Sequence, residues 1–225
     1  MDFGLFCLMN QRSGTQTVID MLSHTSEQVQ AAEMAGFKTA WFAEHHFSNY
    51  SLTPSPLMMV AHMAAQTTKI QLATGVLVLP LYHPARLLGE IGMADQMAQG
   101  RLVLGIGSGY QPFEFDRFGL NLEEAKDRTL EMLEILEAGL TETEVSFDGQ
   151  YISQANTQIN VRPVENRMPE VWVAGGHPDL LLKAARKNYT PIITGRLFGP
   201  EFLVAQKEYC SQFWTQSGHS PTKMN

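Results

Sequence analysis

The chain has 225 residues, of which 44% are hydrophobic and 17% are charged, and its net charge is −7. This composition is typical of a globular domain with a sizeable core rather than of a disordered segment. The acidic balance and the lack of a basic cluster argue against a nucleic-acid partner, and no apolar run reaches the roughly 18 residues of a membrane span. Of the two cysteines, Cys7 lies in an apolar strand-like run and Cys210 in a helix-like run, so we expect reduced thiols in a cytoplasmic protein.

Strand-like and helix-like stretches alternate along most of the chain. Short apolar runs without helical period predict strands, and amphipathic stretches bounded by capping residues, proline or glycine predict helices. Asn121 is expected to cap one of these helices, with Glu124 as its reciprocal capping partner. In chain order we expect a strand at 2–9, a helix at 25–35, a strand at 38–43, a helix at 56–65, a strand at 69–78, a helix at 84–99, a strand at 102–107, the helix after Asn121, a strand at 170–174, a helix at 178–187, a strand at 191–194 and a helix at 200–215.

Residues 145–164 interrupt this rhythm. Asp148-Gly149 is a turn signal between two strand-like runs, so we expect a β-hairpin insertion. The alternating remainder makes about six βα units, which predict a parallel sheet with helical cover. Eight such units close a barrel, so six leave either an open doubly wound sheet or an incomplete barrel. We expect a single domain over residues 1–225.

Polar side chains cluster where the second predicted strand ends, at Glu44, His45 and His46. Parallel α/β folds carry their chemistry at this end of the strands. Neighbouring strand residues point to opposite faces, so only one of the two imidazoles can face the interior, and Glu44 shares a face with His46. We therefore expect no metal site here, but one histidine acting as acid, base or oxyanion stabiliser. The alternative is that these groups only hydrogen-bond a loop.

Glycines mark two further strand ends. Gly105, Gly107 and Gly109 alternate, which places them on one face and indicates close approach of a ligand or tight helix packing. Gly175-Gly176 lies between a strand and a helix start, where free N–H groups can bind an anion. The cationic side chains of Lys126 and Arg128 are candidate phosphate partners, or belong to a solvated helix face.

Four segments together resemble the bacterial luciferase-like family of flavin-dependent monooxygenases. They are AEHHF at 43–47, VLP at 78–80 with HP at 83–84, DQM at 95–97 with GR at 100–101, and EFDRFG at 114–119. The resemblance implies a TIM-type (β/α)₈ barrel, here with about six units and the hairpin. It also implies an enzyme that uses FMNH2 from a separate flavin reductase to insert one oxygen atom of O2 into a small organic substrate through a C4a-peroxyflavin.

The resemblance also assigns roles to residues. His45 corresponds to the histidine near the flavin C4a atom, with Glu44 and His46 as its catalytic neighbours. Gly75-Val76 corresponds to a non-proline cis peptide beside the flavin, and Gly107 to a small residue facing the ring. The remaining expected cofactor-binding residues are Ser108, Lys126, Arg128, Ala174, Gly175 and Gly176.

Some features depart from the family pattern. Ser108 stands where luciferase has a phosphate-binding arginine, so we expect weaker phosphate binding or replacement by Arg128. Family members continue with two more strands and helices, so we expect a fragment or truncated product whose open barrel dimerises or aggregates. A homodimer is the expected assembly. Two alternative functions remain: hydride transfer with deazaflavin F420, and an inactive flavin-binding remnant.

Overall fold

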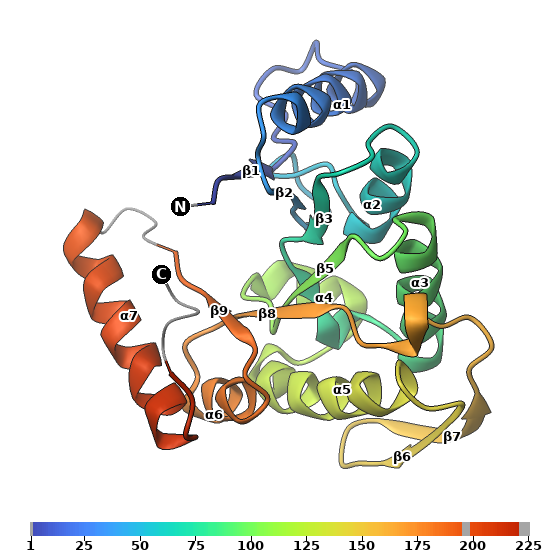
Figure 1. Ribbon diagram of the computed structural model, residues 1–225, viewed down its shortest axis with the longest axis vertical. Helices are drawn as coiled ribbons and strands as arrows, with labels where there is room; N and C mark the ends of the chain where they lie inside the picture. The colour runs from blue at the N-terminus through green and yellow to red at the C-terminus, as the bar shows by residue number, and fades with distance from the viewer. Residues whose placement is uncertain (1, 195–198, 221–225) are drawn as a thin grey trace.

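The computed structural model describes residues 2–194 and 199–220, and its centre is a parallel sheet that curves around one open side (Figure 1). The sheet order is β1-β2-β3-β5-β8-β9, and the short strand β4 pairs with β5. The strands are β1 (Gly4–Cys7), β2 (Thr39–Phe42), β3 (Gln71–Thr74), β4 (Leu77–Val78), β5 (Leu102–Gly107), β8 (Glu170–Ala174) and β9 (Thr190–Ile192).

Helices cover the convex face of this sheet. Figure 1 shows α1, α2, α3, α5 and α6 outside the strands, while α7 lies beyond β9 and faces β1 across the open side. The helices are α1 (Val18–Met34), α2 (Pro56–Ala64), α3 (Pro84–Met97), α4 (Pro112–Phe118), α5 (Ala125–Gly139), α6 (Pro178–Arg186) and α7 (Gly199–Gln216), with short 3₁₀ turns at Leu79–Leu81, Leu122–Glu124 and Val164–Asn166. The expected α/β fold is confirmed, in its incomplete-barrel form rather than as a doubly wound sheet.

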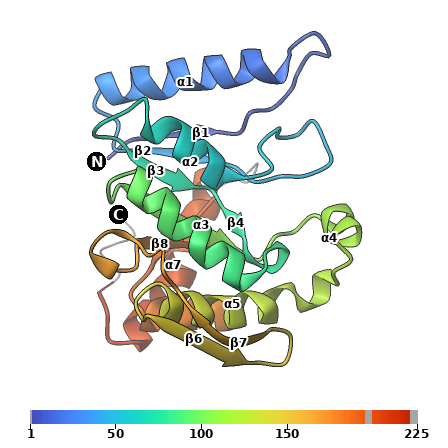
Figure 2. The same cartoon turned by 90° about the vertical axis from the view of Figure 1, so that its right-hand side faces the viewer.

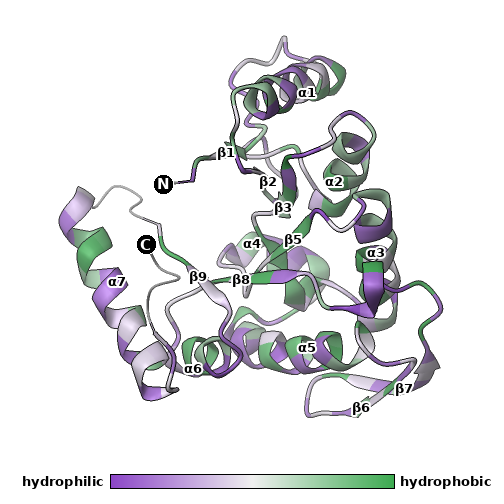
Figure 3. Cartoon of the chain, viewed as in Figure 1, coloured by the Kyte–Doolittle hydropathy of each residue, from purple (hydrophilic) through white to green (hydrophobic). Residues whose placement is uncertain are grey.

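The main core lies between the sheet and its helices. Phe42, Leu72 and Leu104 from the strands are fully buried there, together with Leu88 and Leu133 from the helices. Helices α3 and α5 show green apolar and purple polar residues in Figure 3, as expected of helices with one buried face. Burial of such side chains is the main force that holds the helical layer on the sheet.

The concave face of the sheet carries aromatic side chains. Trp41 of β2 and Trp172 of β8 meet edge to face, with ring centroids 5.0 Å apart. A trough of about 610 Å³ runs along this face, and its lining includes Phe3 and Phe6. These two side chains are 62% and 57% exposed. The half-barrel therefore presents an apolar inner surface at its open side.

Several expected element boundaries were wrong. Helix α1 begins seven residues earlier than predicted, at Val18, because Thr17 and Asp20 form a capping box at its start. The strand expected at 69–78 is divided into β3 and β4 by a cis peptide between Gly75 and Val76. Helix α4 was not predicted, although it supplies a residue of the candidate site described below.

The hairpin insertion is confirmed as β6 (Glu144–Asp148) and β7 (Ser153–Gln158), but its loop spans residues 149–152 rather than the predicted Asp148-Gly149. Asn121 does cap the next helical turn, through Glu123 N–H. Glu124 does not complete a capping box, because its carboxylate pairs with Arg128 instead.

Cys7 and Cys210 are buried free thiols, and burial raises the pKa of Cys7 to about 12. Over the described ranges, no helix is both long and apolar enough to cross a membrane.

Candidate functional site

The candidate site lies at the carboxyl ends of the parallel strands. In Figure 2 the loops after β1 and β2 extend to the same side of the molecule as α4, which follows β5. The polar residues 44–46 begin the loop after β2. The structure thus gathers loops that are distant in the sequence at one end of the half-barrel.

Glu44 is buried and fully engaged in hydrogen bonds. Its Oε2 accepts from the backbone N–H of Val78, at 3.0 Å, and from the hydroxyl of Tyr82, at 2.8 Å. Its Oε1 lies 3.0 Å from Nε2 of His46. Burial, followed by the charge of Glu44, raises the pKa of Tyr82, so that phenol stays protonated and donates. The expected common face of Glu44 and His46 is confirmed.

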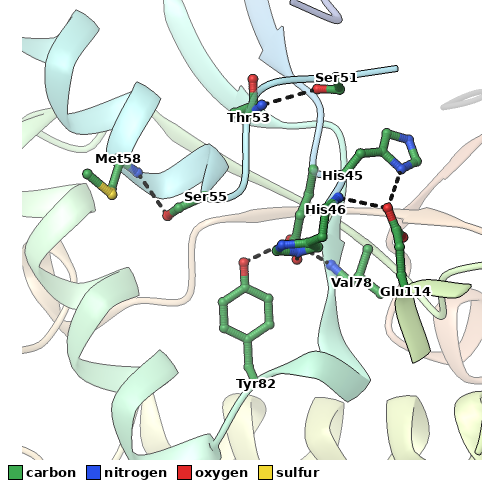
Figure 4. A network of polar contacts seen from close by, with 10 residues as sticks. His45, His46, Ser51, Thr53, Ser55, Met58, Val78, Tyr82 and Glu114 are labelled. Carbon is green, nitrogen blue, oxygen red and sulfur yellow. Dashed lines mark hydrogen bonds and ion pairs between the residues drawn. The ribbon is translucent and has the colours of Figure 1, made fainter. Parts of the chain in front are cut away.

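His45 turns away from this group toward a second buried carboxylate, that of Glu114 (Figure 4). Its Nδ1 lies 3.1 Å from Glu114 Oε1, and the same oxygen accepts from the backbone N–H of His46 at 2.8 Å. The two neighbouring imidazoles therefore have different carboxylate partners from different elements. Glu114 was quoted only as part of the EFDRFG segment, and no role was expected for it.

The short helix α4 positions Glu114 through its defined ends and the packing of its neighbour Phe115. Pro112 begins the helix and Gly119, with φ of 70°, ends it. The fully buried Phe115 packs with Val78 in a small core cluster. A Cβ at Gly109 would lie 2.7 Å from Val78 Cγ1 and 2.8 Å from Phe115 Cε2, so this glycine allows the close packing.

Two tyrosine rings flank His45. Tyr50, from the loop after β2, has its ring centroid 4.8 Å from the imidazole, and Tyr110, after β5, lies at 5.8 Å. Both rings are about half exposed, at 45% and 49%. The carbonyl of Tyr50 accepts from the Asn10 side chain at 3.4 Å, which ties this loop to the one after β1. His45 therefore lies beside two aromatic residues that are partly exposed.

The carboxyl ends of β4, β5 and β8 are joined by sheet pairing. Val78, which donates to Glu44, is paired in register with Gly107, and Gly107 is paired with Ala174 on its other side. A Cβ on Gly107 would lie 2.9 Å from Val76 Cγ2. The peptide between Gly75 and Val76 is cis, as the family resemblance implied. Adjacent strand ends thus connect the histidine pair with the chain that leads to Gly175.

The glycines predicted to form one ligand floor have different surroundings. A Cβ on Gly105 would overlap the carbonyl oxygen of Thr74 and lie 3.1 Å from the Trp41 ring, so close packing accounts for this glycine. Gly109 lies beyond the end of β5 and packs against Phe115. Of the three, only Gly107 has sheet neighbours that lead to both predicted parts of the site.

The turn between β8 and α6 has the features of an anion site. Gly175 has φ of 147°, and no atom lies within 4 Å of a Cβ placed on Gly176. Lys126 Nζ lies 3.1 Å from Asp179, in the first turn of α6, so the structure brings this lysine to the predicted turn. Hydrogen bonds to Asp127 and Asp179 raise the pKa of Lys126, which keeps it cationic.

Of the other predicted residues, Arg128 has partners outside this turn. Arg128 is directed to Glu124, at 2.8 Å, and its guanidinium lies over the ring of Tyr151, at 5.2 Å. Ser108 is half buried just after β5. Within the part of the chain that the structure describes, no group of three or more His, Cys, Asp or Glu side chains could hold a metal ion.

Sequence reasoning missed Glu114, Tyr50 and Tyr110. The signal for Glu114 was available, because it opens the EFDRFG segment that contributed to the family resemblance. Its contact with His45 spans 69 positions, however, and depends on a short helix without a long amphipathic stripe. Nothing in the local pattern identifies such a partner.

Comparison with known proteins supports one family. The family model described as Luciferase-like monooxygenase matches residues 1–225. An uncharacterized protein, y4vJ, of Sinorhizobium fredii (strain NBRC 101917 / NGR234) is 47% identical over 203 residues, which cover 90% of this chain and 58% of that protein. The oxygenase component of a flavin-dependent trigonelline monooxygenase of Acinetobacter baylyi (strain ATCC 33305 / BD413 / ADP1) is 32% identical, covering 80% of this chain and 50% of that protein.

Solved structures give the same result. The oxygenating constituent of 3,6-diketocamphane monooxygenase from Pseudomonas putida, a Type II Baeyer-Villiger monooxygenase in complex with FMN, matches with a TM-score of 0.87 and 26% identity, covering 98% of this chain and 64% of that one. A coenzyme F420 dependent tetrahydromethanopterin reductase from Methanopyrus kandleri shares the fold, with a TM-score of 0.74 and 19% identity over 99% of this chain and 63% of that one.

This chain therefore spans between about half and two thirds of the length of these relatives. Its fold, its full-length match and its similarity to flavin-dependent oxygenases lead to one conclusion: the chain belongs to the luciferase-like monooxygenase family.

Proposed function

We propose that the chain forms the FMN-binding and oxygen-handling part of an enzyme that inserts one oxygen atom from O2 into a small organic substrate. The observation that carries this proposal is the continuity of the strand ends. Glu44 binds Val78, Val78 pairs with Gly107, and Gly107 pairs with Ala174, which leads directly to Gly175. One end of this series carries the histidine pair and the other end carries the candidate phosphate turn.

The turn after β8 fits the phosphate of FMN. The positive end of the α6 helix dipole favours an anion at this turn, although Pro178 has no N–H and the N–H of Asp179 is accepted by Nδ1 of His177. Gly176 leaves open space, and Lys126 lies close enough to add a positive charge. Ser108, at the end of β5, and Ala174 complete this side of the proposed cofactor site.

The opposite end fits the flavin ring. Gly107 offers no side chain, and the adjacent Gly75-Val76 segment brings backbone to the same strand ends. Reduced FMN, when bound, supplies the electrons that reduce O2. The side chains of this chain that can hold or move a proton beside such a ring are those of His45 and its neighbours.

Each residue near the ring has a distinct task in this proposal. His45 holds a proton at, or accepts one on, its Nε2 atom, since its Nδ1 faces Glu114. The rings of Tyr50 and Tyr110 reduce the access of water to that imidazole. Glu44 fixes the Val78 segment and so the position of Gly107.

A separate flavin reductase would supply reduced FMN. The Acinetobacter baylyi relative is named as an oxygenase component, which supports a system of two proteins. The working assembly that we propose is a homodimer acting on a small molecule.

Anaerobic titration of the purified chain with FMNH2, and separately with reduced F420, tests the proposal. We expect saturable binding of FMNH2, followed by O2 consumption when air is admitted. Preferential binding of F420 with oxygen-independent substrate reduction would instead favour hydride transfer. FMN binding without turnover, with a reductase and a panel of substrates supplied, would identify an inactive remnant, and binding of neither cofactor would contradict the proposal.

A further inference from the structure

We infer that Glu114 is a positioning residue that fixes His45 with its proton on Nδ1, and that Glu44 holds the adjacent His46 as the opposite tautomer. This inference rests on the proposed function, because it states how the imidazole of that site is prepared. The two carboxylates are nearly inaccessible, with side-chain exposures of 2% for Glu114 and 1% for Glu44.

The hydrogen bonds of Glu114 set the direction of the His45 proton. Oε1 of Glu114 accepts from the backbone N–H of His46, at 2.8 Å, which fixes this oxygen beside the loop. An ionised carboxylate only accepts hydrogen bonds, so Nδ1 of His45, 3.1 Å from the same oxygen, must carry the proton. The partner of one ring nitrogen decides the tautomer of the whole ring.

The other nitrogen of His45 is consequently left for a ligand. Among residues 2–194 and 199–220, no hydrogen-bond partner lies within reach of its Nε2. The His45 side chain is 11% exposed and lies beside the partly open rings of Tyr50 and Tyr110. Nε2 is therefore an unprotonated acceptor on a ring that lies beside Tyr50 and Tyr110.

His46 has the reverse arrangement. Its Nε2 lies 3.0 Å from Glu44 Oε1, so this nitrogen carries the proton. The second oxygen of Glu44 is occupied by Val78 N–H and the Tyr82 hydroxyl. Tyr82 lies on the His46 side of the network in Figure 4, and Glu114 lies on the His45 side.

These contacts give the three predicted catalytic residues, Glu44, His45 and His46, two different roles. Glu114 serves the imidazole that meets the ligand, whereas Glu44 and His46 secure the backbone between β4 and the following turn. The protonated nitrogen of His46 is engaged by Glu44, and both oxygens of Glu44 have partners within the protein. We therefore place Glu44 and His46 with the positioning residues and keep His45 as the catalytic one.

Nitrogen-15 NMR of the ligand-free chain, labelled at histidine, tests the inference directly. The spectrum is recorded at a pH high enough for neutral imidazoles, where protonated and unprotonated ring nitrogens resonate separately. The chain has seven histidines, so His45→Gln and His46→Gln each assign one set of signals by its loss. We expect Nδ1–H for His45 and Nε2–H for His46, and the same tautomer for both would overturn the inference.

A matched pair of variants then identifies the partner of each ring. Glu114→Leu removes the acceptor with a side chain of similar size, and we expect the Nδ1–H to Nε2–H ratio of His45 to fall about tenfold or more, with His46 keeping its tautomer. Glu44→Leu should instead shift the ratio of His46 alone. A His45 ratio that is unaffected by Glu114→Leu, or that responds to Glu44→Leu, would contradict the assignment. Should either variant fail to fold, the spectrum of the unmodified chain still decides.

A kinetic measurement distinguishes a role of Glu114 in positioning His45 for the reaction from a purely structural role. Glu114→Gln keeps an oxygen acceptor without charge, so we expect the His45 tautomer to persist while kcat falls about 100-fold, with FMN affinity within about threefold. An unchanged kcat would remove Glu114 from the reaction. Because the tautomers are read without flavin, they test this inference even if FMN binding fails, and failure of binding alone would contradict only the proposed function.

Discussion

At the scale of single residues, the candidate site depends on which carboxylate each histidine meets. The chain order Glu44-His45-His46 invites the interpretation of one triad, but alternation along the chain sends the two imidazoles to different partners. Sequence reasoning could place these residues at a strand end and put Glu44 with His46. It did not pair His45 with Glu114, because that contact exists only once α4 has folded against the loop.

Substitution of His45 tests its role beside the ring. We expect His45→Ala to uncouple O2 consumption from substrate oxidation, because the ring nitrogen that Glu114 does not engage is lost, while FMN affinity changes by less than about threefold, or under about 1 kcal/mol. Product formed per O2 consumed is the measurement. His46→Ala is the comparison, since His46 points toward Glu44. Equal coupling in His45→Ala and the unmodified chain would exclude the role.

At the scale of helices and strands, the alternating pattern was sufficient to predict most elements but not where they end or how they connect. Strand 69–78 was expected to be continuous, and the cis peptide at Gly75-Val76 divides it, which apolar periodicity cannot reveal. The DQM and GR segments of the family resemblance lie at helix α3 and its end. Asp95 accepts from Val164 N–H and Arg101 donates to carbonyls such as that of Ile70, so these segments stabilise connections between elements.

Two glycines in α3 provide a matched test of packing. A Cβ on Gly92 would overlap the carbonyl oxygen of Val161, whereas no atom lies within 4 Å of a Cβ on Gly89. We expect Gly92→Ala to destabilise the chain by about 1–3 kcal/mol, and Gly89→Ala to stabilise it by about 0.5–1 kcal/mol. Urea unfolding measures both. Equal effects would show that α3 does not approach the chain after β7 this closely.

Glu33, near the end of α1, should make stability depend on pH. Burial alone would raise the pKa of Glu33, but hydrogen bonds from the backbone N–H groups of Ile70, Lys69 and Thr68 together lower it below its ordinary value of 4.5. A group with a lowered folded-state pKa stabilises the fold above its ordinary value and loses that contribution as the pH falls through the folded value.

We therefore expect Glu33→Ala to lower the free energy of unfolding by about 1–3 kcal/mol at neutral pH, because three N–H groups lose their acceptor. The deficit should shrink as the pH falls below 4.5, the ordinary pKa of this side chain. Urea unfolding at a series of pH values measures it, with Glu27→Ala as the control on the same helix. A deficit independent of pH would refute the assignment.

At the scale of the whole molecule, the half-barrel has apolar side chains on both faces of its sheet. Those under the helices form the buried core, whereas those in the trough at the open side are partly exposed and include Phe3, Phe6, Trp41 and Trp172. Exposed apolar surface of this kind promotes association. The sequence predicted such a surface from the number of βα units, and the exposed phenylalanines agree with that expectation.

The trough should drive self-association of the isolated chain. We expect Phe6→Ser to reduce the fraction of dimers and larger species in sedimentation velocity, because it removes a side chain that is 57% exposed in the trough. Met34→Ser, on α1 outside the sheet, removes an even more exposed apolar side chain and serves as the control. A larger effect of Met34→Ser would place the association surface on the helical face.

Gly75 and Val76 line the trough together with Trp41 and Trp172, so the trough is the competing location for a flat aromatic ligand, and a crystal structure of the chain with FMN distinguishes the two. We expect the flavin ring at the strand ends, between His45 and Gly107, with the phosphate at Gly175-Gly176. A ring bound instead along Trp41 and Trp172, with the strand ends free, would contradict it.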